Sequence, residues 1–105
     1  MTKRIYLDHA ATTSVSPEVF EAMSPYFTEQ FGNANSQHAF GRECEIAVIE
    51  AREMLAKAIG ARSNEVYFTS CGSESDNWAV KGAALLGLEK GKKHIITTQI
   101  EHPAI

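Results

Sequence analysis

The segment Phe68–Asn77, with the sequence FTSCGSESDN, decides the fold. β-Branched and aromatic residues over 66–69 predict a strand that ends in a turn of small residues, and a helix opens directly from that turn. In an α/β protein this is where a phosphate group is held, because free N–H groups at a helix start face the anion and the helix dipole favours negative charge. Gly72 allows close approach of the backbone, and the hydroxyls of Ser70 and Ser73 are donors.

The same segment also has a simpler interpretation as a helix cap. Ser73 with Asp76 fits a variant of the capping box, in which the serine begins the helix. Such boxes are common, and many of them bind no anion. Glu74 and Asp76 suit the helix dipole, but they would repel an anion if they pointed at it. An anion site therefore requires both carboxylates to point away from the turn, and the local sequence leaves both interpretations open.

Composition and charge are those of a small globular protein. The 105 residues are 44% apolar and 22% charged, and the net charge of −3 without a basic cluster argues against a nucleic-acid partner. No apolar run approaches the roughly 20 residues that a membrane span needs, and the amino terminus lacks the apolar core of a secretory signal. Cys44 and Cys71 are widely separated, so we expect free thiols in a cytoplasmic protein rather than a metal-ligand pair or a disulfide.

The first helix of the chain is expected after an extended arm over residues 1–15. Ser16 and Pro17 predict the helix start, with the serine as N-cap and the proline at the first helical position. Apolar residues then recur at a helical spacing, which predicts an amphipathic helix. Pro25 lies inside this pattern, and a proline in a helix interior removes a hydrogen bond and clashes with the preceding turn. We therefore expect Pro25 to kink the helix or to divide it.

A second, longer helix is predicted over 41–59, after a loop over 31–39 that is rich in glycine, asparagine and serine. Its apolar side chains, which include Leu55 and Ile59, form one stripe, while most charged side chains lie off that stripe. A glycine directly after the last apolar position is the usual helix stop, because glycine adopts the left-handed conformation without strain. Gly60 is therefore expected to end this helix.

The remaining elements predict an α/β fold. A strand over 65–70, a helix over 73–88 and a strand over 94–98 form a strand–helix–strand unit, which implies a right-handed crossover and two parallel strands. These two strands need not be adjacent. A sheet of two strands cannot cover its own faces and edges, so further strands are expected outside this sequence.

Four motifs along the chain share the order and approximate spacing of one enzyme family. They are YLDHAATT at Tyr6–Thr13, FGN with NSQH inside Phe31–His38, TSCGSESDN at Thr69–Asn77, and HIITT followed by Glu-His inside His94–His102. With these motifs the chain resembles the cysteine desulfurases, which are pyridoxal-phosphate (PLP) enzymes of the class V aminotransferase group. No single motif is decisive, but four in register are specific together, and they span essentially the whole chain.

The resemblance implies a particular fold. That fold is the N-terminal part of the PLP-dependent type I aminotransferase fold, an α/β architecture with a mostly parallel sheet and flanking helices, which is incomplete in this chain. Intact members of the family are several times longer. Residues 1–105 are therefore expected to form a single segment, with an extended arm over 1–15 and the start of the large PLP-binding domain over 16–105.

The resemblance also assigns roles to three residues. Gly72 and Ser73 are expected to bind the phosphate of PLP, and His102 is expected to stack on its pyridine ring. Pro103 favours an extended backbone at His102, which without the resemblance would be interpreted as an ordinary loop histidine. No catalytic residue is expected in this segment, because the Schiff-base lysine and the nucleophilic cysteine of the family lie beyond Ile105. We predict no metal site, since His9 and His38 have no third ligand at a suitable spacing.

Three positions raise further alternatives. Cys71 stands where the family has glycine, so it is either a thiol whose pKa is lowered by the helix start or a small buried residue that fills a gap. Ala34 replaces the usual proline of the family, which removes a source of loop rigidity. Glu101 either orients His102 or caps a following element.

The function implied by the resemblance is that of a cysteine desulfurase. Such an enzyme takes sulfur from L-cysteine, gives L-alanine and a protein-bound persulfide, and serves iron–sulfur cluster or thio-cofactor assembly. A cytoplasmic homodimer with a sulfur-acceptor or scaffold protein as partner is expected. The alternatives are another class V enzyme, namely a selenocysteine lyase or an aminotransferase, and a non-catalytic assembly fragment.

Overall fold

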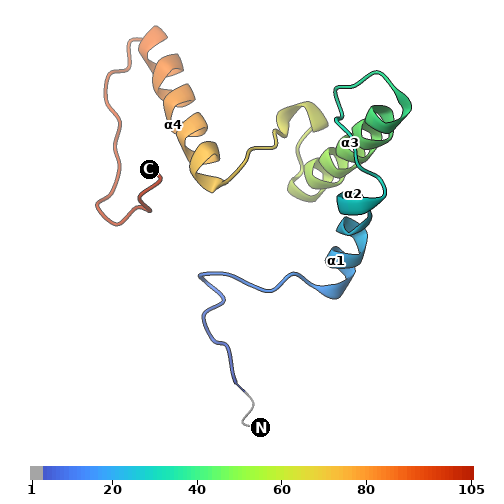
Figure 1. Cartoon of the computed structure of the whole chain (residues 1–105). Coiled ribbons are helices and arrows are strands. Elements are labelled where there is room, and N and C mark those ends of the chain that lie inside the picture. Colours follow the sequence, from blue (N-terminus) through green and yellow to red (C-terminus); the bar gives the residue numbers. More distant parts are fainter. Residues whose placement is uncertain (1–3) are drawn as a thin grey trace. The chain divides into compact units, whose positions relative to one another are not determined.

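The computed structural model of the chain describes residues 4–105. It forms two compact units, of which the first ends at Ser63 and the second runs from Asn64 to Ile105 (Figure 1). The predicted arm is non-helical over its described residues, 4–15, while residues 1–3 lie outside the described part. The proposed division between this arm and a domain over 16–105 stays a prediction. No described helix has the length and apolar character needed to cross a membrane.

Two short helices open the first unit, α1 (Pro17–Met23) and α2 (Pro25–Thr28). Ser16 is the N-cap of α1, and its hydroxyl oxygen accepts a hydrogen bond from the Val19 N–H at 3.4 Å. This contact satisfies one of the amide groups that a helix start leaves without a carbonyl partner. The predicted helix start is therefore confirmed. Pro25 divides the helix, as expected, because it begins α2 directly after the break.

The long helix α3 (Ala39–Ile59) confirms the prediction over 41–59 and begins slightly earlier. His38 is its N-cap, and the ring atom Nδ1 accepts a hydrogen bond from the Gly41 N–H at 3.4 Å. Gly60 ends the helix with a φ of +69°, a left-handed conformation in which a side chain would be strained. The predicted stop at Gly60 is also confirmed.

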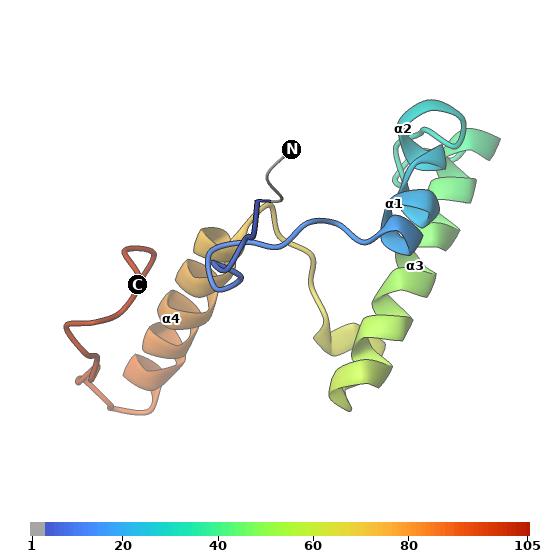
Figure 2. The same cartoon turned by 90° about the horizontal axis from the view of Figure 1, so that it is seen from below.

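The loop between α2 and α3 packs closely against the start of α3. Figure 2 shows this loop turning back beside the helix. The Cys44 thiol donates to the Gln30 carbonyl at 3.3 Å, and the rings of Phe31 and Phe40 lie 5.9 Å apart between centroids. A Cβ at Gly32 would collide with the Phe40 carbonyl and approach the Cys44 sulfur. The loop glycine therefore fits this contact because it has no side chain.

The large side chains of the apolar stripe predicted for α3 are exposed in the structure. Leu55 is 49% exposed and Ile59 is 72% exposed, whereas the buried hydrophobic residues of the described chain are Cys44 and Ala56. The loop covers Gly41 and Cys44 near the start of α3. Among residues 4–105, no element covers the wider stripe of large side chains, and this is why the sequence pattern did not correspond to burial.

A short 3₁₀ helix, η1 (Ser63–Glu65), spans the boundary between the two units, and the second unit contains the helix α4 (Gly72–Glu89). Helix α4 confirms the element predicted over 73–88, with one more residue at each end. Gly91 follows with a φ of +73° and turns the chain back alongside the helix (Figure 1). The unit therefore consists of one helix with an irregular segment on either side.

Neither predicted strand is present as a strand in the described residues. Glu65, the expected first residue of the strand over 65–70, belongs to η1, and the segment over 94–98 is irregular. A strand requires ladder hydrogen bonds to a neighbouring strand, and the two segments make none to each other. Non-adjacent strands of one sheet would not pair with each other either. The predicted parallel sheet therefore stays a prediction.

Gly41 provides a test of the packing between the loop and α3. A Cβ at this buried glycine would collide with the Ser36 carbonyl and would lie 2.6 Å from the Asn33 carbonyl oxygen. Because both neighbours are backbone atoms, Gly41→Ala should lower the free energy of unfolding by about 1–3 kcal/mol. Urea unfolding followed by far-ultraviolet circular dichroism measures this change.

Gly82→Ala is the matched control for this measurement. Gly82 lies inside α4, and outside the adjoining backbone of its own helix no atom lies within 4 Å of the position that an added methyl group would take. Alanine is the better helix former, so this substitution should raise the free energy of unfolding by about 0.5–1 kcal/mol. Equal stability of Gly41→Ala and the unsubstituted chain would contradict the close packing described for the loop.

Candidate functional site

The helix start at the candidate phosphate turn differs from the predicted capping box. Helix α4 begins at Gly72, and its N-cap is Cys71, whose side chain makes no capping hydrogen bond. Ser73 is therefore already inside the first turn, where its hydroxyl is in the wrong position to act as N-cap. The predicted box between Ser73 and Asp76 is wrong.

The Glu74 side chain, rather than Ser73, makes side-chain hydrogen bonds that hold this turn. Its carboxylate oxygen Oε2 accepts two hydrogen bonds from Ser70, one from the backbone N–H at 2.6 Å and one from the hydroxyl at 2.8 Å. The condition that Glu74 points away from the turn, which was set for an anion site, is therefore not met. A glutamate at the third helical position commonly reaches back to the N-cap amide, and here it reaches one residue further, to Ser70. The Ser70 hydroxyl is already engaged and is not assigned to an anion.

A second pair of hydroxyl groups supports the same turn. The Thr69 and Ser75 side-chain oxygens lie 2.6 Å apart, and each also lies within hydrogen-bond distance of the Cys71 carbonyl, at 3.1 and 3.3 Å. Thr69 precedes the turn and Ser75 lies in the helix, so these bonds connect the two sides. The start of α4 is thus held from both the backbone and the side chains.

The Cys71 thiol reports the electrostatic character of this turn. The side chain is exposed, so the interpretation of Cys71 as a small buried residue is wrong. The backbone amide of Glu74 and, next, the Ser70 hydroxyl lower the pKa of the Cys71 thiol below its ordinary value. These two donors favour the thiolate of Cys71, while the negative charge of Glu74 opposes it.

Gly72 and Ser73 lie at the first two positions of α4, where a phosphate would meet the helix. Their amides belong to the first turn, whose N–H groups have no carbonyl one turn earlier in the helix. Nothing lies within 4 Å of a Cβ built at Gly72, so the backbone is open to an approaching group. Amides, a hydroxyl and a positive helix end are the donor set that phosphate prefers. These donors fit a phosphate group, but the Glu74 carboxylate stays at the same turn, where the two donors of Ser70 bind it.

His102 lies in a compact turn near the end of the chain. Its ring atom Nδ1 accepts a hydrogen bond from the Ala104 N–H at 3.1 Å, and its carbonyl accepts one from the Ile105 N–H at 2.9 Å. Glu101 does not bond to the His102 ring, because its carboxylate accepts from the Thr98 hydroxyl at 2.9 Å. The suggestion that Glu101 orients His102 is therefore not supported by the observed contacts.

Asn77 connects the two halves of the candidate site, a role that the sequence analysis did not identify. Its amide nitrogen Nδ2 donates to the Ser73 carbonyl at 2.9 Å and to the Ala104 carbonyl at 3.0 Å. The returning tail thus lies beside the start of α4 (Figure 1). Asparagine is unfavourable inside a helix, and this was the available signal that Asn77 serves a contact outside its own helix.

Motif residues of the first unit form their own local contacts. The Tyr6 hydroxyl donates to the carbonyls of Asp8 and Thr12 at 2.8 and 3.2 Å, and the His9 ring meets the Tyr6 ring edge-on at 5.2 Å between centroids. His38 is engaged as the N-cap of α3. Within residues 4–105, no group of three or more metal-ligating side chains gathers at one place.

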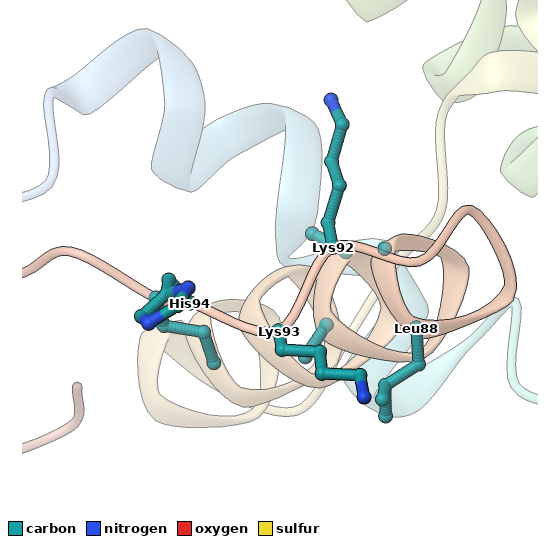
Figure 3. Close-up of a pocket in the computed structure, with 8 residues that line it drawn as sticks. Leu88, Lys92, Lys93 and His94 are labelled. Atoms are coloured by element: carbon teal, nitrogen blue, oxygen red, sulfur yellow. The ribbon is translucent and has the colours of Figure 1, made fainter.

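A shallow pocket of about 330 Å³ lies at the other end of α4 and is distinct from the candidate site (Figure 3). Leu88, Lys92, Lys93 and His94 are among the residues that line it. Its walls are formed by the small residues of α4 and by the segment that follows Gly91. It contains none of the residues predicted to bind the cofactor.

Comparison with known proteins identifies the family. The model of the family described as aminotransferase class-V matches residues 5–105, and the chain therefore belongs to this family. A solved structure named as a NifS-like protein superposes with a TM-score of 0.88 at 45% sequence identity, covering 97% of this chain and 28% of that one. The chain thus has the fold of the corresponding part of the NifS-like protein.

Among the proteins that are similar in sequence to this chain are several cysteine desulfurases. The cysteine desulfurase IscS of Dictyoglomus turgidum is 55% identical over 105 residues, which are 100% of this chain and 26% of that protein. The cysteine desulfurase IscS of Methanosarcina thermophila is 53% identical over 103 residues, which are 98% of this chain and 25% of that protein. The chain therefore spans about a quarter of the length of these relatives. The resemblance to cysteine desulfurases is confirmed.

The contact between Glu74 and Ser70 predicts a measurable titration. The Ser70 amide and, next, the Ser70 hydroxyl lower the pKa of the Glu74 carboxyl below its ordinary value. A lowered folded-state pKa means that the contact stabilises the turn at pH above about 4.3, and that this stability is lost as the pH falls through the lowered pKa. Carbon-detected NMR titration should give that lowered pKa, and Ser70→Ala should raise it part of the way back, because the amide donor remains.

Glu18 is the internal control for this titration. Its pKa is also lowered, by its own backbone amide and then by the Ser16 hydroxyl at the start of α1. Ser70→Ala should leave the titration of Glu18 unchanged. An unchanged pKa of Glu74 in Ser70→Ala would show that the hydroxyl makes no contact with this carboxylate.

Proposed function

We propose that this chain is part of a PLP-dependent cysteine desulfurase, which removes sulfur from L-cysteine and releases L-alanine. In the reaction the C–S bond of the substrate breaks and an S–S bond forms to an enzyme cysteine, whose persulfide then serves a sulfur-acceptor or scaffold protein. A cytoplasmic homodimer is part of the proposal. The observation that carries it is the placement of the α4 start and the His102 turn in one unit, joined through Asn77. Identity to cysteine desulfurases along the whole chain supports the same conclusion.

In this proposal the start of α4 holds the phosphate end of PLP. The cofactor supplies an electron sink, whereas the protein supplies binding and orientation. The Gly72 and Ser73 amides and the Ser73 hydroxyl donate to the phosphate oxygens. The Glu74 carboxylate stays on Ser70, and the donors of Ser70 offset its charge. Bound in this way, the phosphate fixes one end of the cofactor.

The His102 ring is the second contact with the cofactor in this proposal. Because Nδ1 accepts the Ala104 amide hydrogen, a neutral ring carries its proton on Nε2. The imidazole is flat and exposed, so one of its faces is available to a flat pyridine ring. The protein thereby fixes both the tautomer and the position of the ring before the cofactor binds.

The test of the function uses the full-length protein. Purified with PLP, it should show the visible absorbance of the bound cofactor and should release equal amounts of alanine and persulfide sulfur from L-cysteine. The 105-residue chain alone should release neither, because none of its lysines matches the Schiff-base context of the family. Selenocysteine and amino-group acceptors are the comparison substrates. A full-length protein that prefers either of these to L-cysteine would contradict the proposal.

Ser73→Ala tests the phosphate contact in the full-length protein. A hydrogen bond to a charged group contributes about 1.5–3 kcal/mol, so the affinity for PLP should fall by about one to two powers of ten. Because Ser73 is not the N-cap of α4, the stability measured without cofactor should not fall by the roughly 1 kcal/mol that a lost cap costs. Titration with PLP, followed by visible absorbance, measures the affinity.

Ser73→Thr is the control, because threonine keeps the hydroxyl and should restore the affinity for PLP. Ser75→Ala is unsuitable as a neutral control, since the Ser75 hydroxyl bonds to Thr69 and Cys71. Equal affinity of the Ser73→Ala variant and the unsubstituted protein would remove Ser73 from the phosphate site.

A further inference from the structure

Asn77 uses both hydrogens of its side-chain amide in ordered contacts. One bond, to the Ser73 carbonyl at 2.9 Å, stays within α4 and joins residues one helical turn apart. The other, to the Ala104 carbonyl at 3.0 Å, joins residues 27 positions apart in the sequence. A primary amide has two N–H donors, so the donor capacity of Asn77 is filled. Both Asn77 and Ala104 are partly buried, which shields this bond from water.

The bond to Ala104 continues to the ring of His102. Ala104 accepts from Asn77 at its carbonyl and donates from its amide to His102 Nδ1 at 3.1 Å. The His102 carbonyl also accepts from the Ile105 amide at 2.9 Å, which closes the same turn. A continuous series of hydrogen bonds therefore runs from the Ser73 carbonyl, through Asn77 and Ala104, to the imidazole.

We infer that Asn77 is a positioning residue that sets the His102 ring relative to the helix start at Gly72 and Ser73. The inference rests on the proposed function, in which these two places hold opposite ends of the same cofactor. Asn77 itself touches neither end. It fixes the separation between them by holding the backbone of the returning tail against α4, so that cofactor binding requires less ordering of the His102 turn.

Two substitutions separate the bonds of Asn77. Asn77→Ser keeps a hydroxyl, which inside a helix can bond to the Ser73 carbonyl, but it is too short to reach Ala104. Asn77→Asp keeps the shape of the side chain and removes both donors. Asn64→Asp is the matched control, because it makes the same chemical change at an exposed position in η1.

The experiment uses the full-length protein and measures PLP affinity, the visible circular dichroism of the bound cofactor, and thermal unfolding without cofactor. Asn77→Ser should weaken PLP binding about five- to tenfold, as expected for the loss of one ordered hydrogen bond, and Asn77→Asp should weaken it at least as much, because both donors are lost. Both should also change the circular dichroism band, since the ring of His102 no longer holds a fixed orientation. Asn64→Asp should leave the affinity and the band unchanged.

A double substitution with His102→Ala distinguishes positioning from general stabilisation. If Asn77 acts through His102, Asn77→Ser should change PLP affinity less than twofold when His102→Ala is already present. An equal loss of affinity in both backgrounds would overturn the inference, as would unchanged affinity in Asn77→Ser alone. Failure of the unsubstituted protein to bind PLP would instead overturn the proposed function, and with it the role of Asn77 toward the cofactor.

Discussion

The two hydrogen bonds between Ser70 and the Glu74 carboxylate determine where α4 begins, and the candidate site depends on that position. They hold the backbone before the helix in place, so that Cys71 becomes the N-cap and Gly72 and Ser73 enter the first turn. Bonds to an ionised acceptor are stronger than neutral ones, which suits a turn that is exposed to water. The Glu74 backbone amide and, next, the Ser70 hydroxyl lower the pKa of the Cys71 thiol, whereas the negative charge of Glu74 raises it. The first-turn amides thus favour an anion at the helix start, while the Glu74 carboxylate opposes one.

Local hydrogen bonds, more than a buried core, organise both units. The buried hydrophobic residues among 4–105 are Cys44 and Ala56, and both lie on α3. The remaining order comes from caps, turns and short-range side-chain contacts, such as those of His38 at the start of α3 and of Asn77 in α4. Hydrogen bonds of this kind fix the local conformation of the backbone at the helix ends and turns. They contribute little hydrophobic stabilisation, which scales with the apolar area that is removed from water.

Much of the helical structure could be predicted from the sequence, because its signals are local. Ser16 with Pro17, Pro25 and Gly60 act through their own backbone preferences, and the structure follows them. The Glu74 contact could not be distinguished from a capping box at Ser73, since both use the same residue types and differ by a small shift in the helix start. Asn77 was missed because its partner is distant in sequence. The strands at 65–70 and 94–98 depend on neighbouring strands, and local propensity cannot supply these partners.

The exposed apolar stripe of α3 has a consequence for how the protein is made. At a synthesis rate of roughly 5–20 residues per second, a segment of this size takes on the order of 5–20 seconds to leave the ribosome. During that time Leu55 and Ile59 have no covering surface within residues 4–105. Helices can form at once from local bonds, but tertiary order has to wait until apolar partners cover the stripe. Transiently exposed apolar surface of this kind makes a nascent chain prone to aggregate until the stripe is covered.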